Sequence, residues 1–217
     1  GGVDNLRVAI AWALGKDGDD ATAIALAGSS VHVWVGLGHF AEAEAMLQHA
    51  SDRVAPSTPS ALEAELSYAV AVMYGQRHQQ RTIAAARRAV ELWQSLGERT
   101  RLGCALYALG GAYAQEGEAE AEPILREAQP LLEESGRARL QAMAHSAFAV
   151  FHAARGRPLE ATCEARAALE LYRAAGADGN LLTTLGALAD QVWAQGEPDR
   201  AVEAAREVVE MHRRSPF

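Results

Sequence analysis

The sequence predicts an all-α protein, an α-solenoid of about five antiparallel helix pairs preceded by one N-terminal helix. Good helix formers dominate the chain, chiefly Ala, Leu, Glu, Arg and Gln, and apolar residues recur at intervals of three and four. The alternation of β-branched residues that is typical of strands is scarce. Glycines separate the helical segments, and the pattern repeats with a period of about forty residues.

The pattern divides the chain into eleven helical segments with short connections. These segments are residues 5–14, 20–36, 40–53, 60–75, 79–95, 99–116, 119–134, 138–155, 158–175, 179–195 and 198–213. Most of them end at a glycine, because a residue without a Cβ adopts the left-handed conformation at a helix end without steric cost. The glycines at these ends are Gly38, Gly75, Gly97, Gly117, Gly136, Gly156, Gly176 and Gly196.

Prolines mostly mark helix starts. Pro59, Pro158 and Pro198 lie at or just before the start of a segment, where the missing N–H costs nothing. Pro123 is expected in the first turn of its helix. Pro130 falls deeper in the same segment, so it is expected to kink that helix or to end it early.

The second helix of each pair carries small residues at two levels. The upper level is spaced by 39, 39, 40 and 40 residues, at Ala50, Ala89, Ala128, Ala168 and Val208. The lower level lies seven residues before each of these, at Ala43, Thr82, Ala121, Ala161 and Ala201. Small side chains allow helices to approach closely, and a fixed period with one helix pair per unit is typical of an α-solenoid.

Composition excludes several classes of function. The formal net charge is −8 and no run of Lys or Arg interrupts it, so we expect no direct binding of nucleic acid. Cys104 and Cys163 have neither CxxC spacing nor metal-ligand neighbours, which favours structural thiols in a reducing compartment. Apolar stretches end well before about twenty residues, and no signal peptide is recognisable. We therefore expect a cytoplasmic protein that does not enter a membrane.

The motifs that could carry chemistry have simpler interpretations. "VHVWVGLGHFA" at residues 31–41 contains a GxGxxA string, but no βαβ unit surrounds it and the repeat places Gly38 at a helix–helix turn. "GKDGDD" at residues 15–20 lacks the upstream glycine of a phosphate-binding loop. The carboxylates are periodic, as on solvated helix faces, and no nucleophile–histidine arrangement has a local signature. We therefore expect no enzyme activity and no cofactor.

Two of the seven histidines lie on one helix face. His145 and His152 are seven residues apart, but no third ligand follows at helical spacing, and a stable zinc site needs three or four. We therefore expect no metal site. Both histidines are expected to be buried and neutral, so that stability would be lost as the pH falls through about 6.5.

Two stretches resemble tetratricopeptide-like repeats. "ALYALGGAYAQEG" at residues 105–117 resembles the first helix of such a repeat, with its large and small positions filled by Leu106, Leu109, Gly110 and Tyr113. "GRPLEATCEARAALEL" resembles the second helix. The resemblance covers roughly residues 20–213 in five units longer than the common 34-residue form. It implies a right-handed solenoid over residues 20–217.

The opening "DNLRVAIAWAL" at residues 4–14 resembles the segment that joins the ATPase core to the repeat domain in bacterial signal-transduction ATPases and transcriptional regulators. The resemblance implies that residues 1–19 connect to an upstream domain, in line with a start at Gly-Gly-Val without Met. It further implies that the repeats are a sensor or interaction arm. The alternative is a free-standing scaffold or self-association module without a small-molecule ligand, in which case copies of the chain could associate.

In a solenoid of helix pairs the first helices form the concave wall, which is the expected binding surface. The residues that we expect on this wall are His32, Ser67, Tyr74, Cys104, Tyr107, Met143, Ser146, Asp190 and Trp193. Most of them are aromatic, small or weakly polar. Such a lining suits a helix or an extended apolar peptide of a protein partner, or a small apolar ligand. The alternative is that these side chains only pack across the narrow inside of the superhelix.

Overall fold

A computed structural model describes residues 2–15, 18–75 and 77–176, followed by separate positions between 184 and 210. All regular structure in these residues is helical, which confirms the all-α prediction. The helices are α1 (Gly2–Ala13), α2 (Asp20–Gly36), α3 (Phe40–Ser51), α4 (Ser60–Tyr74), α5 (Gln79–Leu96), α6 (Arg99–Gln115), α7 (Ala121–Glu133), α8 (Ala138–Ala154) and α9 (Pro158–Ala175). The two helices expected over 179–195 and 198–213 fall largely outside the described residues.

Helix boundaries follow the predicted ones closely. α2 and α9 have the predicted limits, whereas α1 begins at Gly2, before the predicted start at residue 5. α7 is shorter than its predicted segment and places Pro123 in its first turn. Pro130 does not end this helix, which continues to Glu133, and the Pro130 carbonyl still accepts a 2.9 Å hydrogen bond from the backbone N–H of Glu134.

Glycine ends helices as predicted, with one exception. Seven of the expected glycines have a positive φ, between 61° and 76°, in the left-handed region. At the end of α5, for example, Gly97 has φ 71° and its N–H bonds back to the carbonyl of Gln94. Gly75 differs, with φ 9° and ψ −88°. The chain turns there without the left-handed cap.

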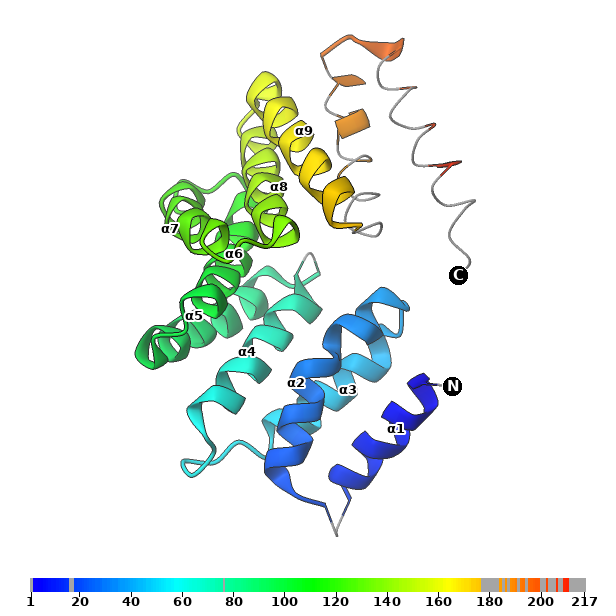
Figure 1. The fold of residues 1–217 in the computed structure, drawn as a ribbon, viewed down its shortest axis with the longest axis vertical. Helices are drawn as coiled ribbons and strands as arrows, with labels where there is room; N and C mark the ends of the chain where they lie inside the picture. The colour runs from blue at the N-terminus through cyan, green and yellow to red at the C-terminus, as the bar shows by residue number, and fades with distance from the viewer. Residues whose placement is uncertain are drawn as a thin grey trace. The chain divides into compact units, whose positions relative to one another are not determined.

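The chain divides into two compact units, Gly1–Leu109 and Gly110–Phe217, with the boundary inside α6. In unit 1, α2 pairs with α3 and α4 pairs with α5, and the first helices α2 and α4 lie side by side (Figure 1). The core of unit 1 joins α1 to the first repeat through Ile10, Ile24, Trp34 and Leu47. A second cluster joins α4, α5 and α6 through Ala64, Ala89, Leu92, Trp93 and Ala105.

In unit 2, α8 packs against both α7 and α9 (Figure 1). Phe151, Leu132 and Tyr172 are fully buried there. The small residues predicted at two levels of the second helices are buried in both units wherever the structure describes them. They are Ala43, Ala50, Thr82, Ala89, Ala121, Ala128, Ala161 and Ala168. Ala201 and Val208 lie outside the described residues.

Gly110 shows why the first helices also need small residues. A Cβ built on this residue would lie 2.6 Å from Cδ2 of Leu125, so an alanine here would force the Leu125 side chain of α7 to shift. This contact confirms Gly110 as the small position of the repeat. A Cβ added to the neighbouring Gly111 would have no atom within 4 Å.

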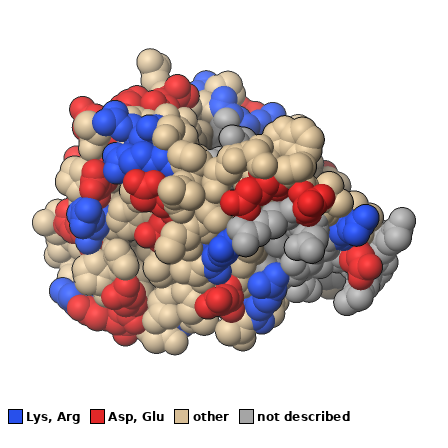
Figure 2. Space-filling view, turned by 90° about the horizontal axis from the view of Figure 1, so that it is seen from above, with Lys and Arg blue, Asp and Glu red and all other residues tan. Residues whose placement is uncertain are grey.

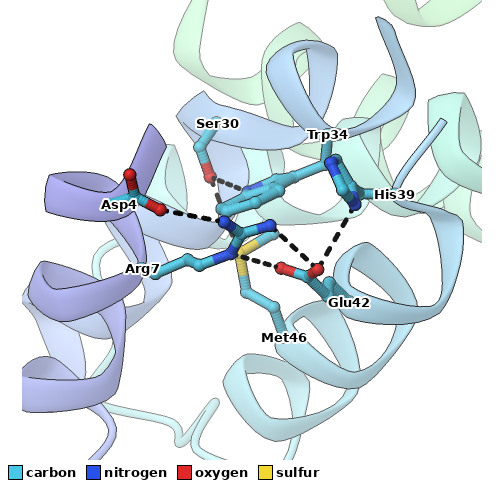
Figure 3. Close-up of polar contacts among 7 residues, drawn as sticks. All are labelled: Asp4, Arg7, Ser30, Trp34, His39, Glu42 and Met46. Carbon is cyan, nitrogen blue, oxygen red and sulfur yellow. Dashed lines mark hydrogen bonds and ion pairs between the residues drawn. The ribbon is translucent and has the colours of Figure 1, made fainter. Parts of the chain in front are cut away.

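A polar cluster attaches α1 to the first helix pair (Figure 3). Arg7 donates two hydrogen bonds to the Glu42 carboxylate, at 2.8 and 3.0 Å, and a third to Asp4 at 3.1 Å. Its guanidinium also lies 5.5 Å from the ring centroid of Trp34, whose indole N–H donates to Ser30 at 3.2 Å. The planar guanidinium serves as both a bidentate donor and a stacking surface, a combination that lysine does not offer.

Candidate binding face

Partly exposed positions recur along one side of the first helices of unit 1. We call this surface the first-helix face; it consists of partly exposed residues of α2, α4 and the start of α6. Its residues recur three or four apart, as expected for one face of a helix. They are Ser29 and His32 on α2, Glu65, Tyr68 and Val72 on α4, and Arg101, Cys104 and Tyr107 on α6.

Three of the sequence-predicted residues of unit 1 belong to this face. His32 is exposed, and Cys104 and Tyr107 are half-buried. The rings of His32 and Tyr68 lie 6.2 Å apart, tilted by 54°, so α2 and α4 present aromatic groups next to one another. Tyr68 is a face residue that the sequence analysis missed.

Tyr74 was expected on the wall, but the structure places it inside unit 1. Its side chain is 7% exposed, and its hydroxyl donates to Glu44 at 2.9 Å and accepts from Arg81 at 2.8 Å. Burial, followed by the hydrogen bond to Glu44, raises the pKa of Tyr74 above its ordinary value. Ser67 is half-buried and follows Glu65 by two residues, which turns it to another side of α4.

The repeat spacing contained the signal that identifies Tyr68. Cys104 and Tyr107 lie one 39-residue period after Glu65 and Tyr68, so these residues occupy equivalent positions in neighbouring repeats. The same period relates Tyr74 to Tyr113, which is also buried and which the repeat pattern already assigns to the core.

An ion pair crosses the first-helix face. Arg101 of α6 reaches over α4, and its Nη1 donates to Oε2 of Glu65. The guanidinium also lies 4.9 Å from the ring centroid of Trp93. Glu65 in turn packs against α2, where a Cβ added to Gly28 would lie 3.1 Å from the Glu65 Cγ. Three first helices are therefore linked at this level.

In unit 2 the residues predicted on the concave wall differ in how far they are exposed. Met143 is buried. The hydroxyl of Ser146 lies 3.3 Å from that of Tyr172 and 3.4 Å from that of Thr184, so Ser146 contacts α9 and the following segment. Asp190 is exposed, and Trp193 is 65% exposed.

His145 is not the buried neutral group that the sequence suggested. Its Nδ1 lies 2.7 Å from Oε2 of Glu164, and both side chains are only partly buried. The hydrogen bond to Glu164 raises the pKa of His145 above its ordinary value of 6.5, against the opposing effect of burial. The expected sign of its pH dependence was therefore wrong.

His152 fits the packed histidine that the sequence indicated. Its ring lies against Phe148 and Phe151, with centroids 6.3 and 5.5 Å away. The buried Nδ1 of His152 has no hydrogen-bond partner among the described residues. Within this part of the chain, no group of three or more His, Cys, Asp or Glu side chains is arranged to hold a metal ion.

Surface charge is mixed. Figure 2 shows Lys and Arg next to Asp and Glu over the visible face, without a region given over to one sign. None of the described helices is both long and apolar enough to span a lipid bilayer.

Comparison with known proteins identifies the fold as a helical repeat of the tetratricopeptide-like type. A Rap protein complexed with competence and sporulation factor has a TM-score of 0.78 and 16% identity, over 88% of this chain and 54% of that chain. The apo form of RapI has a TM-score of 0.64 and 16% identity, over 88% and 70%. BtubC from P. vanneervenii has a TM-score of 0.66 and 16% identity, over 99% and 92%.

The chain thus spans about half the length of the Rap protein in that complex. No protein-family model matches the sequence, and no curated protein is similar to it. At 16% identity these likenesses show the fold alone.

Proposed function

We propose that the chain is a protein-binding helical-repeat scaffold and that its first-helix face holds an extended or helical peptide of a partner. One observation supports the proposal: in unit 1, three successive first helices present exposed or half-buried aromatic and hydrogen-bonding side chains on one surface. Aromatic side chains bring large contact area at low entropic cost, and binding energy concentrates in a few such residues. Tyr68 and Tyr107 are the expected anchors.

The comparisons support this proposal at the level of the fold. A Rap protein with the same kind of helical repeat has been solved in complex with competence and sporulation factor. The proposal assigns binding rather than a chemical step to the first-helix face, since Glu65 is tied to Arg101 and His32 lies against Tyr68.

We further propose that the scaffold is the sensor or interaction arm of a larger bacterial regulatory ATPase or transcriptional regulator. The resemblance of residues 4–14 to the connecting segment of those proteins supports this context. α1 is fixed to the first repeat by Arg7 and by Ile10, so a movement upstream would be transmitted directly to α2 and α3.

A second candidate is self-association without a ligand. The observation that favours it is the outer side of α1, where Val8 and Trp12, one helical turn apart, are both exposed. Sedimentation velocity of the wild type and of Trp12→Glu tests it. A dimer that Trp12→Glu dissociates would support self-association, and two identical monomeric profiles would contradict it.

The peptide-binding proposal is tested by selecting ligands from a displayed library of random peptides and titrating the selected peptide. Tyr107→Ala and Tyr68→Ala should each weaken binding by about 1 to 3 kcal/mol. Glu160→Ala, an exposed change on the second helix α9, is the control and should leave affinity unchanged. Equal affinities for all variants would place the binding site elsewhere.

A further inference from the structure

We propose that Arg101 determines the specificity of the first-helix face by binding an acidic side chain of the partner peptide, and that Glu65 occupies this position while no partner is bound. The inference rests on the proposed function, because it names the chemistry of the partner that the same face would hold.

Arg101 has fewer polar partners among the described residues than Arg7, Arg53, Arg81 and Arg88, which also link helices in unit 1. Arg53 binds Asp20 and two backbone carbonyls, and Arg81 binds Glu44 and the Tyr74 hydroxyl. Arg7 contacts both Glu42 and Asp4, and Arg88 contacts both Glu63 and Glu91. Arg101, by contrast, has one carboxylate partner among the described residues, although a guanidinium carries five N–H donors. Its side chain is 52% exposed, so donors remain open to a second carboxylate.

Trp93 gives this guanidinium a defined orientation. The Arg101 Cζ lies 4.9 Å from the indole centroid, which is within the range of a cation–π contact. A stacked guanidinium retains its in-plane donors for hydrogen bonding. Arg101 is therefore oriented in advance for a planar carboxylate, which reduces the entropic cost of binding one.

Glu65 lies where the carboxylate of a partner would compete. Its stem fits against Gly28, and Tyr68 follows one turn later on the same side of α4. An ion pair with this exposure is weak and is screened by salt. A peptide carboxylate that also gains contacts with Tyr68 and His32 could therefore replace Glu65 or share Arg101 with it.

The same helix provides a matched control pair. Glu63 on α4 binds Arg88 of α5 at 2.8 Å. Glu63 and Glu65 are two positions apart in the sequence, so the two ion pairs lie on different sides of α4. Removing either pair deletes the same kind of interaction, but only the Glu65–Arg101 pair lies on the first-helix face.

The test uses two pools of dye-labelled heptapeptides, randomised over apolar residues and amidated at the C-terminus. One pool has Glu at its centre and the other has Gln. Binding is followed by fluorescence anisotropy at roughly 50 mM salt, where charge interactions are only moderately screened. We expect the wild type to bind the Glu pool about tenfold more tightly than the Gln pool, as a charge-assisted hydrogen bond would give.

Variants test which residues cause the preference for the Glu pool. Arg101→Gln should abolish this preference, and Glu65→Gln should strengthen binding of the Glu pool while leaving binding of the Gln pool unchanged. Glu63→Gln and Arg88→Gln should not change the binding of either pool. Circular dichroism checks that each variant is folded; if Arg101→Gln is not, the response of the near-isosteric Glu65→Gln decides the matter.

The outcomes separate this inference from the proposed function. If both pools bind equally and Tyr68→Ala weakens both, the face binds peptides but Arg101 does not select acidic ones. A Glu preference that persists in Arg101→Gln would likewise overturn the inference. If neither pool binds, or if Tyr68→Ala and Tyr107→Ala leave binding unchanged, the proposed function itself is wrong.

Discussion

The imidazole Nδ1 of His145 on α8 lies 2.7 Å from the carboxylate Oε2 of Glu164 on α9. This contact joins the two helices of a repeat, and its main effect is to raise the pKa of His145 above 6.5. A histidine whose pKa is raised on folding stabilises the folded state while it is protonated. Its contribution is complete below the unfolded pKa and is lost as the pH rises through the folded pKa.

We predict that His145→Gln reduces the loss of thermal stability between about pH 6 and pH 8. Melting temperatures of the wild type and the variant, measured across this range, check the prediction. His49→Gln, an exposed change on α3, is the control. If the wild type and His145→Gln lost stability in parallel as the pH rises, the ion pair would contribute nothing.

Ala161 and Ala168 are fully buried on α9, at the two levels where the helices approach closely. Ala161→Leu and Ala168→Leu should each destabilise the fold by about 1 to 3 kcal/mol through overpacking. Urea unfolding measures the effect. Ala174→Leu, an exposed change on the same helix, should be close to neutral. Unchanged midpoints for both buried variants would refute the assigned repeat positions.

Adjacent glycines of α6 should respond in opposite directions. Gly110→Ala forces a Cβ against Leu125 and should lower the melting temperature. Gly111→Ala has open space and should stabilise the helix by about 0.5 to 1 kcal/mol, since alanine loses less backbone entropy than glycine. Stabilisation by both changes would show that α6 and α7 are farther apart than described.

The Arg7 cluster should control the attachment of α1. Arg7→Met keeps the apolar stem but removes the donors to Glu42 and Asp4. We predict faster amide hydrogen exchange in α1, with α4 and α5 unchanged. Asp52→Asn, an exposed change near the end of α3, is the control. Exchange in α1 that is unaffected by Arg7→Met would mean that apolar packing alone holds the helix.

Most of the fold could be predicted from the sequence because its determinants are local. Glycine and proline mark the ends of helices through backbone sterics, and the alanine levels mark the contacts between them. Tyr74 shows the limit of this reasoning. An aromatic residue on a first helix suits either the core or the binding face, and only consistent use of the repeat period separates Tyr74 from Tyr68.

The polar contacts could not be predicted in the same way. Arg101 and Glu65 are 36 residues apart, and the chain contains many Arg and Glu residues that helical periodicity alone would allow to pair. Which ones meet depends on the distance between neighbouring helices and on small residues such as Gly28. His145 was assigned to the core from its position, whereas its pKa depends on Glu164, which lies on the next helix.

The most direct test of peptide binding by the first-helix face is photo-crosslinking with the library-selected peptide carrying benzoylphenylalanine, followed by mass-spectrometric mapping. The predicted crosslinks lie on the face residues of α2, α4 and α6, around His32, Tyr68 and Tyr107. The Tyr107→Ala variant should reduce their yield, and Glu160→Ala should not. Crosslinks confined to α3, α5 or the outer side of α1 would contradict the account.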